Sequence, residues 1–454
     1  MAGFSGSFDG VDAFYKARLD EWILSYVFLD GYDDRLSNQR CILGKVRHAV
    51  PLLRVCNGCV PVGYTTNLSE GAGQKVRGLI SLDCSSFTLT PMWHILRQDA
   101  IGVLKDKAAR ASLSRYFDVM QDEKPAKFLM AKKLPVKFDA EDSLSNLWQI
   151  HQELTEEFYH FQQKIDSRQN GLDEIEEPEV SYLDLKIQIA NRILEHCHLC
   201  TRRCGFNRIA GELGYCKCGS KISISTIFEH MGEEPELVPS GTIFTLGCSM
   251  RCLHCQNWTI SQWIEDGEIY LPKRLALAVE QLRKNGCRNI NLVGGEPTPW
   301  LQQWLETFKY VTLNVPIVWN SNSYYSEETA DLLAGFADIY LLDFKYGPKE
   351  CAKRISDAPR YWEVCTRNHL CGKKYGELII RVLVLPGHLE CCTKAVLNWI
   401  AENLGKDVRT NVMFQYRPEW RAYEMPELQR RLTRTEVERA IQLAKDAGLT
   451  NFIT

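Results

Sequence analysis

The chain has 454 residues, of which 45% are apolar and 24% are charged, so it is long enough for two or three domains with cores of their own. Its net charge of −3 gives no indication of a nucleic-acid partner or of an anionic membrane surface. No run approaches the ~20 apolar residues of a membrane span, and Met1 to Asp20 lacks the features of a secretory signal. Eighteen cysteines without such a signal indicate metal-binding thiols in a reducing compartment, so we expect a cytoplasmic protein.

Residues 1–176 are predicted to form an α+β region of unknown role. The patterns predict a helix over Lys16–Leu29, short strands between Val46 and Leu89, and helices within Met92–Met120 and Asp142–Ile165. Cys56 and Cys59 form a C-x2-C pair, interpreted as two unligated thiols beside a turn, with a small metal site as the alternative. The acidic stretch from Gln169 to Glu179 has no apolar face and is predicted to be a linker.

Residues 177–240 are predicted to contain a helix, Tyr182–His196, that leads into a cysteine-rich segment. The cysteines of this segment are Cys197, Cys200, Cys204, Cys216 and Cys218. The first four can enclose one metal completely, either as zinc or as an iron–sulfur cluster, and such a closed site would be structural or would relay electrons. Cys218 is then spare, and reduced thiols without metal are the alternative.

From residue 241 onward, short apolar runs alternate with helical patterns. The predicted strands lie at 241–246, 289–293, 316–321, 338–343, 377–385 and 411–416, and the predicted helices at 272–285, 299–309, 326–335, 348–356, 392–404 and 433–447. This alternation predicts an α/β fold with a parallel sheet. Six βα units are too few for a closed eight-stranded barrel. We therefore expect residues 241–454 to form an open partial (βα)6 TIM-like barrel with its site at the carboxyl ends of the strands.

The strand at 241–246 opens into a loop with Cys248, Cys252 and Cys255 in a C-x3-C-x2-C pattern. Three thiolates can hold a [4Fe–4S] cluster and leave one iron free to bind a small molecule. The alternative is a zinc knuckle, in which His254 would have to be the fourth ligand although it lies between two of the cysteines.

The later predicted strands have apolar bodies and polar ends. The ends are Gly294-Gly295-Glu296-Pro297, Asn320-Ser321-Asn322, Asp343-Phe344-Lys345, Pro386-Gly387-His388 and Gln415-Tyr416-Arg417. Glycines let the backbone approach a ligand closely, and a carboxylate such as Glu296 accepts hydrogen bonds from an ammonium group. Five such ends at one edge of a sheet indicate a ligand-binding site.

Residues 197–449 resemble the radical S-adenosylmethionine (SAM) proteins related to pyruvate formate-lyase activating enzyme. The resemblance is closest to an uncharacterised branch that carries a C-x2-C-x3-C cluster ahead of the radical SAM loop. It rests on the three-cysteine loop with its Cys-Gln-Asn-Trp continuation, Gly294 to Thr298, Trp319 to Asn322, Asp343 to Gly347, Leu385 to His388, Glu390 to Thr393, and Gln415 to Pro418.

The resemblance implies a role for each matching residue. Cys248, Cys252 and Cys255 would ligate the [4Fe–4S] cluster, and SAM would chelate its fourth iron. His254 would pack near the adenine. The other SAM contacts would come from Gly294, Gly295, Glu296, Asn320, Ser321, Asp343, Lys345, Arg381 and Leu383. Activating enzymes tend to have an aspartate where Asn320 stands, so the missing charge counts against a cation bound beside SAM.

The implied activity is reductive cleavage of SAM to a 5′-deoxyadenosyl radical, with the electron supplied by an external donor of the flavodoxin or ferredoxin type. The radical would abstract hydrogen from a protein or peptide, as activating enzymes do from a glycine of a partner protein. Two alternatives stay open. One is a radical SAM enzyme that modifies a small metabolite or a peptide side chain with an auxiliary cluster, and the other is a non-catalytic iron–sulfur or zinc scaffold. Neither a nucleic acid nor a membrane is expected as a partner.

Overall fold

The computed structural model describes residues 93–454, apart from residues 168–170 and 263–264. The chain divides into two units, residues 1–86 and Phe87–Thr454, and every described residue belongs to the second. The predicted helix over Lys16–Leu29, the strands predicted between Val46 and Leu89, and the Cys56/Cys59 pair lie outside the described residues. None of the helices in the described part combines the length and apolar character needed to cross a lipid bilayer.

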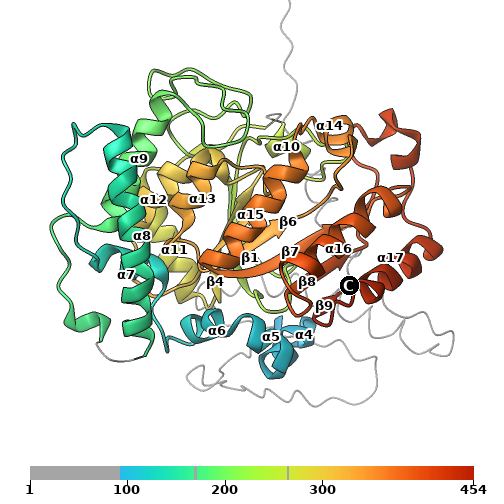
Figure 1. Ribbon diagram of the computed structural model, residues 1–454, viewed down its shortest axis with the longest axis horizontal. Helices are drawn as coiled ribbons and strands as arrows, with labels where there is room; N and C mark the ends of the chain where they lie inside the picture. The colour runs from blue at the N-terminus through green and yellow to red at the C-terminus, as the bar shows by residue number, and fades with distance from the viewer. Residues whose placement is uncertain (1–92, 168–170, 263–264) are drawn as a thin grey trace, which may run out of the picture. The chain divides into compact units, whose positions relative to one another are not determined.

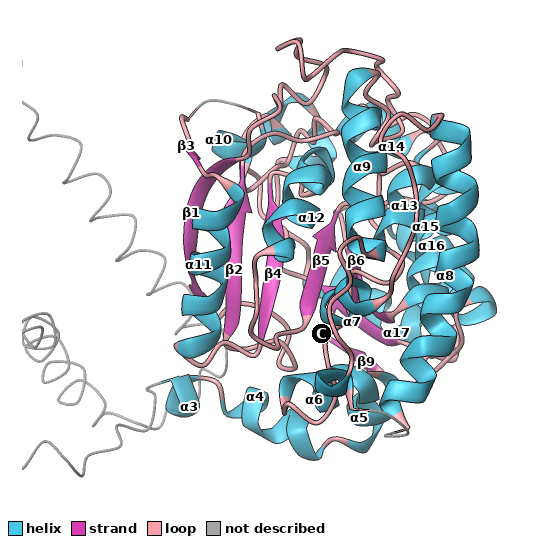
Figure 2. Ribbon diagram, turned by 90° about the vertical axis from the view of Figure 1, so that its left-hand side faces the viewer, coloured by secondary structure: helices cyan, strands magenta, loops and turns pink. Residues whose placement is uncertain are grey.

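A nine-stranded sheet organises the described residues (Figure 2). The strands are β1 Ser223–His230, β2 Ser240–Thr245, β3 Glu268–Ile269, β4 Asn289–Gly294, β5 Ile317–Ser321, β6 Ile339–Asp343, β7 Glu377–Leu383, β8 Arg409–Met413 and β9 Phe452–Ile453. Their order is β3-β1-β2-β4-β5-β6-β7-β8-β9. Neighbours from β2 to β9 are parallel, whereas β1 runs antiparallel to β2 and β3. The predicted α/β fold with a mostly parallel sheet is confirmed.

Helices connect the successive parallel strands, because a parallel connection must cross back to the start of the sheet (Figure 1). They are α11 Pro272–Lys284, η3 Thr298–Trp300, α12 Leu301–Lys309, α13 Glu327–Leu333, α14 Cys351–Ser356, α15 Tyr361–Tyr375, α16 Lys394–Asn403 and α17 Arg434–Asp446. Local sequence signals start several of them. Pro272 occupies the first turn of α11, and the Ser326 side chain caps α13 by accepting from the Thr329 amide. Thr433 and Glu436 form a capping box at α17.

Three helices immediately precede the sheet in the chain: the short α7 Lys127–Lys133 and the longer α8 Leu144–Asp166 and α9 Tyr182–Glu195. The helices predicted over Asp142–Ile165 and Tyr182–His196 are confirmed. The stretch Met92–Met120, predicted to be helical, is broken into α3 Trp93–Leu96, α4 Gln98–Gly102, η1 Val103–Lys105, α5 Lys107–Ser112 and α6 Ser114–Met120. Asp106 ends η1 with an extended backbone and caps α5. The predicted linker contains a short turn of helix, η2 Leu172–Glu174.

Side chains alternate between the two faces of the sheet. The helix face includes Ile243, Leu292, Trp319, Leu342 and Ile380, which belong to one large buried core shared with the helices. The other face, called the polar face below, carries Asn291, Asn320, Asp343, Arg381 and Asn411, which the strand register places on the same side. Polar side chains on a sheet interior indicate a site rather than a core.

The amino-terminal half of the polar face is closed by α6, and we call this closure the floor. Tyr116 and Phe117 of α6 pack with Val318, Leu341 and Ile379 in a second buried core. Figure 2 shows α6 beneath the ends of the strands. The floor blocks this end of the sheet, so a ligand must reach the polar face from the carboxyl ends of the strands.

Buried Asp338, just before β6, fixes the floor to the sheet. Its carboxylate lies 3.1 Å from the Arg115 guanidinium of α6 and accepts from the backbone amides of Lys127 and Ile317 at 3.1 and 2.9 Å. One carboxylate therefore joins α6, α7 and β5.

The domain boundaries predicted after residues 176 and 240 stay predictions.

Several elements were not predicted, among them β1 and α15. Strand β1 lies between β2 and β3 and runs antiparallel to both, so it lies outside the βα pattern, although its residues 225–228 alternate between half-buried and exposed. Helix α15 buries Asn368, His369 and Gly372 together with apolar residues, so its sequence lacks an apolar stripe. The strands predicted at 377–385 and 411–416 end at Leu383 and Met413.

Candidate active site

The three cysteines of the C-x3-C-x2-C pattern lie on the loop that follows β2. Gly247 has a φ of +85° and turns the chain into this loop. Two backbone bonds fix the loop to α14, from the Arg251 amide to Ser356 O and from the Leu253 amide to Ile355 O, both at 2.9 Å. The loop, called the cluster loop below, is therefore held on both sides, as a preorganised metal site requires.

Burial raises the pKa of all three thiols, that of Cys255 to about 11. Among the described residues, one group of Cys, His, Asp and Glu side chains has its ligand atoms all within 4.8 Å of one another, and it does not include Cys248, Cys252 or Cys255. A single ion gathers its ligands closely, whereas a four-iron cluster binds each thiolate to a different iron. The [4Fe–4S] ligation by Cys248, Cys252 and Cys255 stays a prediction.

His254, the proposed fourth ligand of a zinc knuckle, is engaged elsewhere. It is buried, its Nε2 lies 3.0 Å from the Tyr346 hydroxyl, and its ring meets the Tyr416 ring edge-on at 5.7 Å. Burial lowers its pKa to about 4, so the imidazole is neutral at pH 7. The structure gives no support to the zinc-knuckle alternative.

Glu296 follows β4 and accepts several hydrogen bonds there. Its buried carboxylate accepts from the Thr298 hydroxyl at 2.5 Å, the Ser321 hydroxyl at 2.7 Å and the Asn322 amide at 2.9 Å. Burial raises its pKa, and these hydrogen bonds oppose the rise. Glu296 thus joins the ends of β4 and β5 and places an acceptor at the predicted SAM position.

Gly294 and Gly295 allow a close approach within the protein itself, and their predicted contact with SAM stays a prediction. A Cβ on Gly294, whose φ is +136°, would lie 2.1 Å from the Thr245 nitrogen, and one on Gly295 would lie 2.2 Å from Gly247 O. Both glycines therefore let β4 approach β2 and the base of the cluster loop. The close approach that they permit is to the protein's own backbone.

Asn322 was not among the predicted site residues. Its side-chain nitrogen lies 3.5 Å from Cys248 Sγ and 3.4 Å from Ser249 Oγ, and its backbone amide donates to Glu296. It therefore connects Glu296 to the cluster loop. Its position directly after Ser321 in a polar strand end was the sequence signal for it.

Asp343 and Lys345 form an ion pair at the end of β6. Burial alone would lower the pKa of Lys345, but Asp343 and Cys252 raise it overall, so the ammonium stays charged. Lys345 also opposes the effect of burial on the pKa of Cys252. A fixed positive charge therefore lies beside the cluster loop.

The sequence profile of the radical SAM superfamily matches residues 242–400, from β2 into α16. This chain belongs to the radical SAM superfamily. It is 43% identical over 343 residues to the uncharacterized protein MJ0674 of Methanocaldococcus jannaschii, a match that covers 74% of this chain and 98% of that protein. It is 24% identical over 250 residues to the uncharacterized protein MJ0808 of the same organism, which covers 51% of this chain and 73% of that protein. Membership implies SAM and an iron–sulfur cluster as cofactors.

In this radical SAM protein, Arg381 is held by acidic residues that the sequence analysis did not single out. Its guanidinium donates to Glu234 at 2.8 and 2.6 Å, pairs with Glu233, and lies 3.3 Å from the Asn320 side-chain oxygen. Both glutamates lie between β1 and β2. Leu383 follows two residues along the same face of β7 and is half-buried. Arg381 and Asn320 thus bond to each other, and the guanidinium is already paired within the protein.

The cysteine-rich segment of the radical SAM protein packs against the cluster loop. Arg202 Nε donates to Ser249 O at 3.0 Å, and Arg251 donates to Tyr215 O. The two guanidinium groups lie over the Tyr215 ring, at 3.6 and 4.2 Å from its centroid. The segment and the cluster loop therefore form one continuous surface.

Arg208 places a buried positive charge among the thiols of this segment. It is 1% exposed, and its Nη1 lies 3.8 Å from Cys197 Sγ. Burial lowers its pKa, but Cys197, Cys218 and Cys216 raise it, and the net shift is upward. The pKa of Cys197 falls to about 5, through a hydrogen bond from Cys204 and the charge of Arg208. A buried cation favours an anionic partner, and Arg208 is one of the causes that lower the pKa of Cys197 and of Cys216.

A surface pocket of about 750 Å³ lies apart from the candidate site, between α8 and the helices α13 and α15. Its lining includes His151, whose Nε2 lies 2.8 Å from Nζ of the buried Lys186. Burial lowers the pKa of both groups. None of the predicted site residues lines this pocket.

Proposed function

We propose that this protein is a radical SAM enzyme that holds a [4Fe–4S] cluster on Cys248, Cys252 and Cys255. When bound, the cluster and SAM supply a 5′-deoxyadenosyl radical for hydrogen abstraction. The observation that carries the proposal is a loop with three buried or half-buried thiols at the carboxyl end of β2, with His254 turned to Tyr346 instead of to the thiols. Three thiolates without this fourth ligand leave an iron for SAM.

The protein's own residues prepare the place for SAM. The Glu296 carboxylate offers an acceptor to the SAM ammonium group, and its bonds to Ser321 and Asn322 fix its orientation. Asn322 contacts both Glu296 and Cys248, so it links the carboxylate proposed to bind SAM to a thiol proposed to bind iron. The Lys345 ammonium partly offsets the negative charge that a thiolate-bound cluster brings to the loop.

The sheet is proposed to curve into an open partial barrel with the polar face inside. The floor supports this, because it fills one end of the polar face with Tyr116 and Phe117. The sheet order supports it too, since β3 and β9 stand at opposite ends of the order and the described strands do not close into a ring. An open barrel exposes its mouth to a bulky substrate.

The substrate is proposed to be a protein or peptide, as for pyruvate formate-lyase activating enzyme. The open mouth inferred above admits a loop of a partner protein, and the glycyl Cα–H bond is the one that enzymes of this type break. The proposal includes an external one-electron donor of the flavodoxin or ferredoxin type and a cytoplasmic location.

The test uses the full-length protein reconstituted anaerobically with iron and sulfide, and reduced in the presence of SAM. We expect 5′-deoxyadenosine and methionine in equal amounts, measured by mass spectrometry. A glycine-containing peptide deuterated at Cα should then transfer deuterium to 5′-deoxyadenosine. Cleavage of SAM without any transfer from peptides would reject the protein substrate and favour a small metabolite, and no cleavage at all would reject the enzyme.

A second metal centre is proposed on Cys197, Cys200, Cys204 and Cys216. Its support is the buried Arg208, whose charge a metal-bound set of thiolates would neutralise. Replacing Cys197 and Cys200 together by alanine should remove this metal alone, because the cluster loop keeps its three thiols. Metal analysis should show a loss of about four iron for a cluster or about one zinc for an ion. An unchanged metal content in this variant would contradict the second centre.

A further inference from the structure

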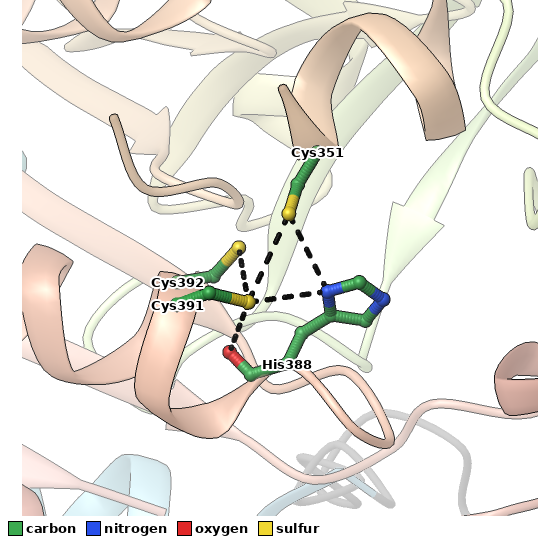
Figure 3. A group of neighbouring side chains, drawn as sticks. All are labelled: Cys351, His388, Cys391 and Cys392. Carbon is green, nitrogen blue, oxygen red and sulfur yellow. Dashed lines mark hydrogen bonds between the residues drawn. The ribbon is translucent and has the colours of Figure 1, made fainter. Parts of the chain in front are cut away.

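Four side chains from two separate segments meet beside the cluster loop: Cys351, His388, Cys391 and Cys392 (Figure 3). Their ligand atoms all lie within 4.8 Å of one another. Cys391 is half-buried and the other three are buried. The three thiols and the imidazole point toward a common centre in Figure 3, although they come from α14 and from the loop after β7.

Four of the six distances within this group match those around a single tetrahedral ion, and the other two are below 4.8 Å. Cys391 Sγ lies 3.8 Å from Cys351 Sγ and 3.8 Å from Cys392 Sγ. His388 Nδ1 lies 3.5 Å from Cys351 Sγ and 3.4 Å from Cys391 Sγ. Ligands at the ~2.3 Å Zn–S and ~2.1 Å Zn–N bond lengths of tetrahedral zinc lie about 3.5–3.8 Å from one another. A four-iron cluster would need its thiolates further apart.

The backbone is shaped to bring these ligands together. Gly387, with a φ of +76°, turns the chain after β7 and presents His388. The next residues form a π-helical turn, η4 Leu389–Thr393, which carries both neighbouring cysteines. Adjacent side chains of an α-helix diverge, and the wider π turn lets two of them face one centre. Such turns are rare and frequently mark functional sites.

The Glu427 carboxylate lies on the side of His388 that faces away from the thiols. His388 Nε2, the nitrogen turned away from the thiols, lies 3.7 Å from Glu427 Oε1. Among the described residues no hydrogen-bond partner lies within range of this buried nitrogen. Histidines that bind a metal through one nitrogen commonly donate the other N–H to a carboxylate, which fixes the tautomer. Glu427 lies on the side where such a carboxylate would stand, and the tautomer with its proton on Nε2 leaves Nδ1 free to accept a metal.

We propose that Cys351, His388, Cys391 and Cys392 form a closed structural zinc site. Because all four ligands come from the protein, no position is open for a substrate. The ion would join the loop after β7 to α14, whose last residues accept the backbone bonds of Arg251 and Leu253. It would thus brace the cluster loop from outside without touching the SAM position.

The test measures zinc and iron per chain in the full-length protein, purified anaerobically with a thiol reductant. We expect Cys391→Ala to contain about one zinc less than the unaltered protein. The matched control is Cys371→Ala, a half-buried cysteine of α15 outside the group, which should keep its zinc. The Cys197/Cys200 alanine variant should also keep this zinc, whatever metal the cysteine-rich segment holds.

Cobalt gives a second, spectroscopic readout that reports the kind of ligand and not only the amount of metal. Cobalt added to the metal-free protein should give thiolate-to-cobalt charge-transfer absorption, and His388→Ala should alter the visible bands because an oxygen ligand replaces nitrogen. Equal zinc in Cys391→Ala and in the unaltered protein would overturn the proposal. A Cys351–Cys391 disulfide in zinc-free protein that forms in place of metal would overturn it as well.

Discussion

Replacing Cys248, Cys252 and Cys255 together by alanine should reduce SAM cleavage to the level seen without protein. The three thiols are the only protein ligands that the cluster loop offers, so their loss should remove about four iron per chain. The measurement is iron content together with 5′-deoxyadenosine formed under reducing, anaerobic conditions. The fold should persist, because these thiols sit at the edge of the core and the loop keeps its backbone bonds to α14.

A matched control replaces Cys287 and Cys371 by alanine, two cysteines that lie outside all three cysteine groups. This variant should keep its iron and its cleavage activity. Undiminished cleavage in the triple variant would reject the central proposal. Lost cleavage in the control would show that the assay reports stability instead of cluster ligation.

Replacing Arg381 by methionine should lower the free energy of unfolding by about 3–5 kcal/mol, because it leaves Glu233 and Glu234 buried without their cation. Denaturant unfolding measures the loss. Adding Glu233→Gln and Glu234→Gln to the same chain should restore most of the stability, since no buried charge is then left unpaired. A small loss of stability together with greatly weakened SAM binding would instead support the SAM contact implied by the resemblance.

The same variant should show a diagnostic pH dependence. Burial raises the pKa of Glu233, but Arg381 and His230 outweigh it and bring this pKa down to about 2. In the unaltered protein this group therefore stabilises the fold above its unfolded pKa of 4.5, and the contribution is lost as the pH falls toward 2. Without Arg381, burial should dominate and raise the pKa. The deficit of the variant should consequently shrink from pH 7 to pH 5.

The parts of the fold that local patterns encode were predictable. The run at 241–246, the helices α8 and α9 and the three-cysteine loop each carry a signal within a dozen or so residues. Helix α15 carries none, because its buried face includes the polar residues Asn368 and His369. Asn368 donates to Ser323 O of another element, and His369 bonds to Cys365 O of its own helix. The group around Cys391 was only partly visible in the sequence. His388, Cys391 and Cys392 are near neighbours in the chain, but Cys351 lies 40 residues before Cys391 and joins them only through packing.

The site itself shows why residue type does not fix a role. Arg381 at a strand end suggested a ligand contact, yet its partners come from the stretch between β1 and β2, a part of the chain without a recognisable motif. Gly294 and Gly295 suggested space for a ligand, and within the protein they make room for Thr245 and Gly247. These partners are distant in sequence, so a single sequence does not display them, and the SAM contacts of the same residues stay predictions.

The floor has a consequence for the autonomy of the radical SAM domain. The family match at 242–400 omits α6, so a fragment with those bounds would expose Val318, Leu341 and Ile379, which Tyr116 and Phe117 now cover. It would also strip Asp338 of its guanidinium partner. The segment 242–400 that matches the family is thus shorter than the segment needed to complete this core. Substitutions in α6 are therefore constrained by the core that α6 shares with β5, β6 and β7, although α6 contains no cysteine.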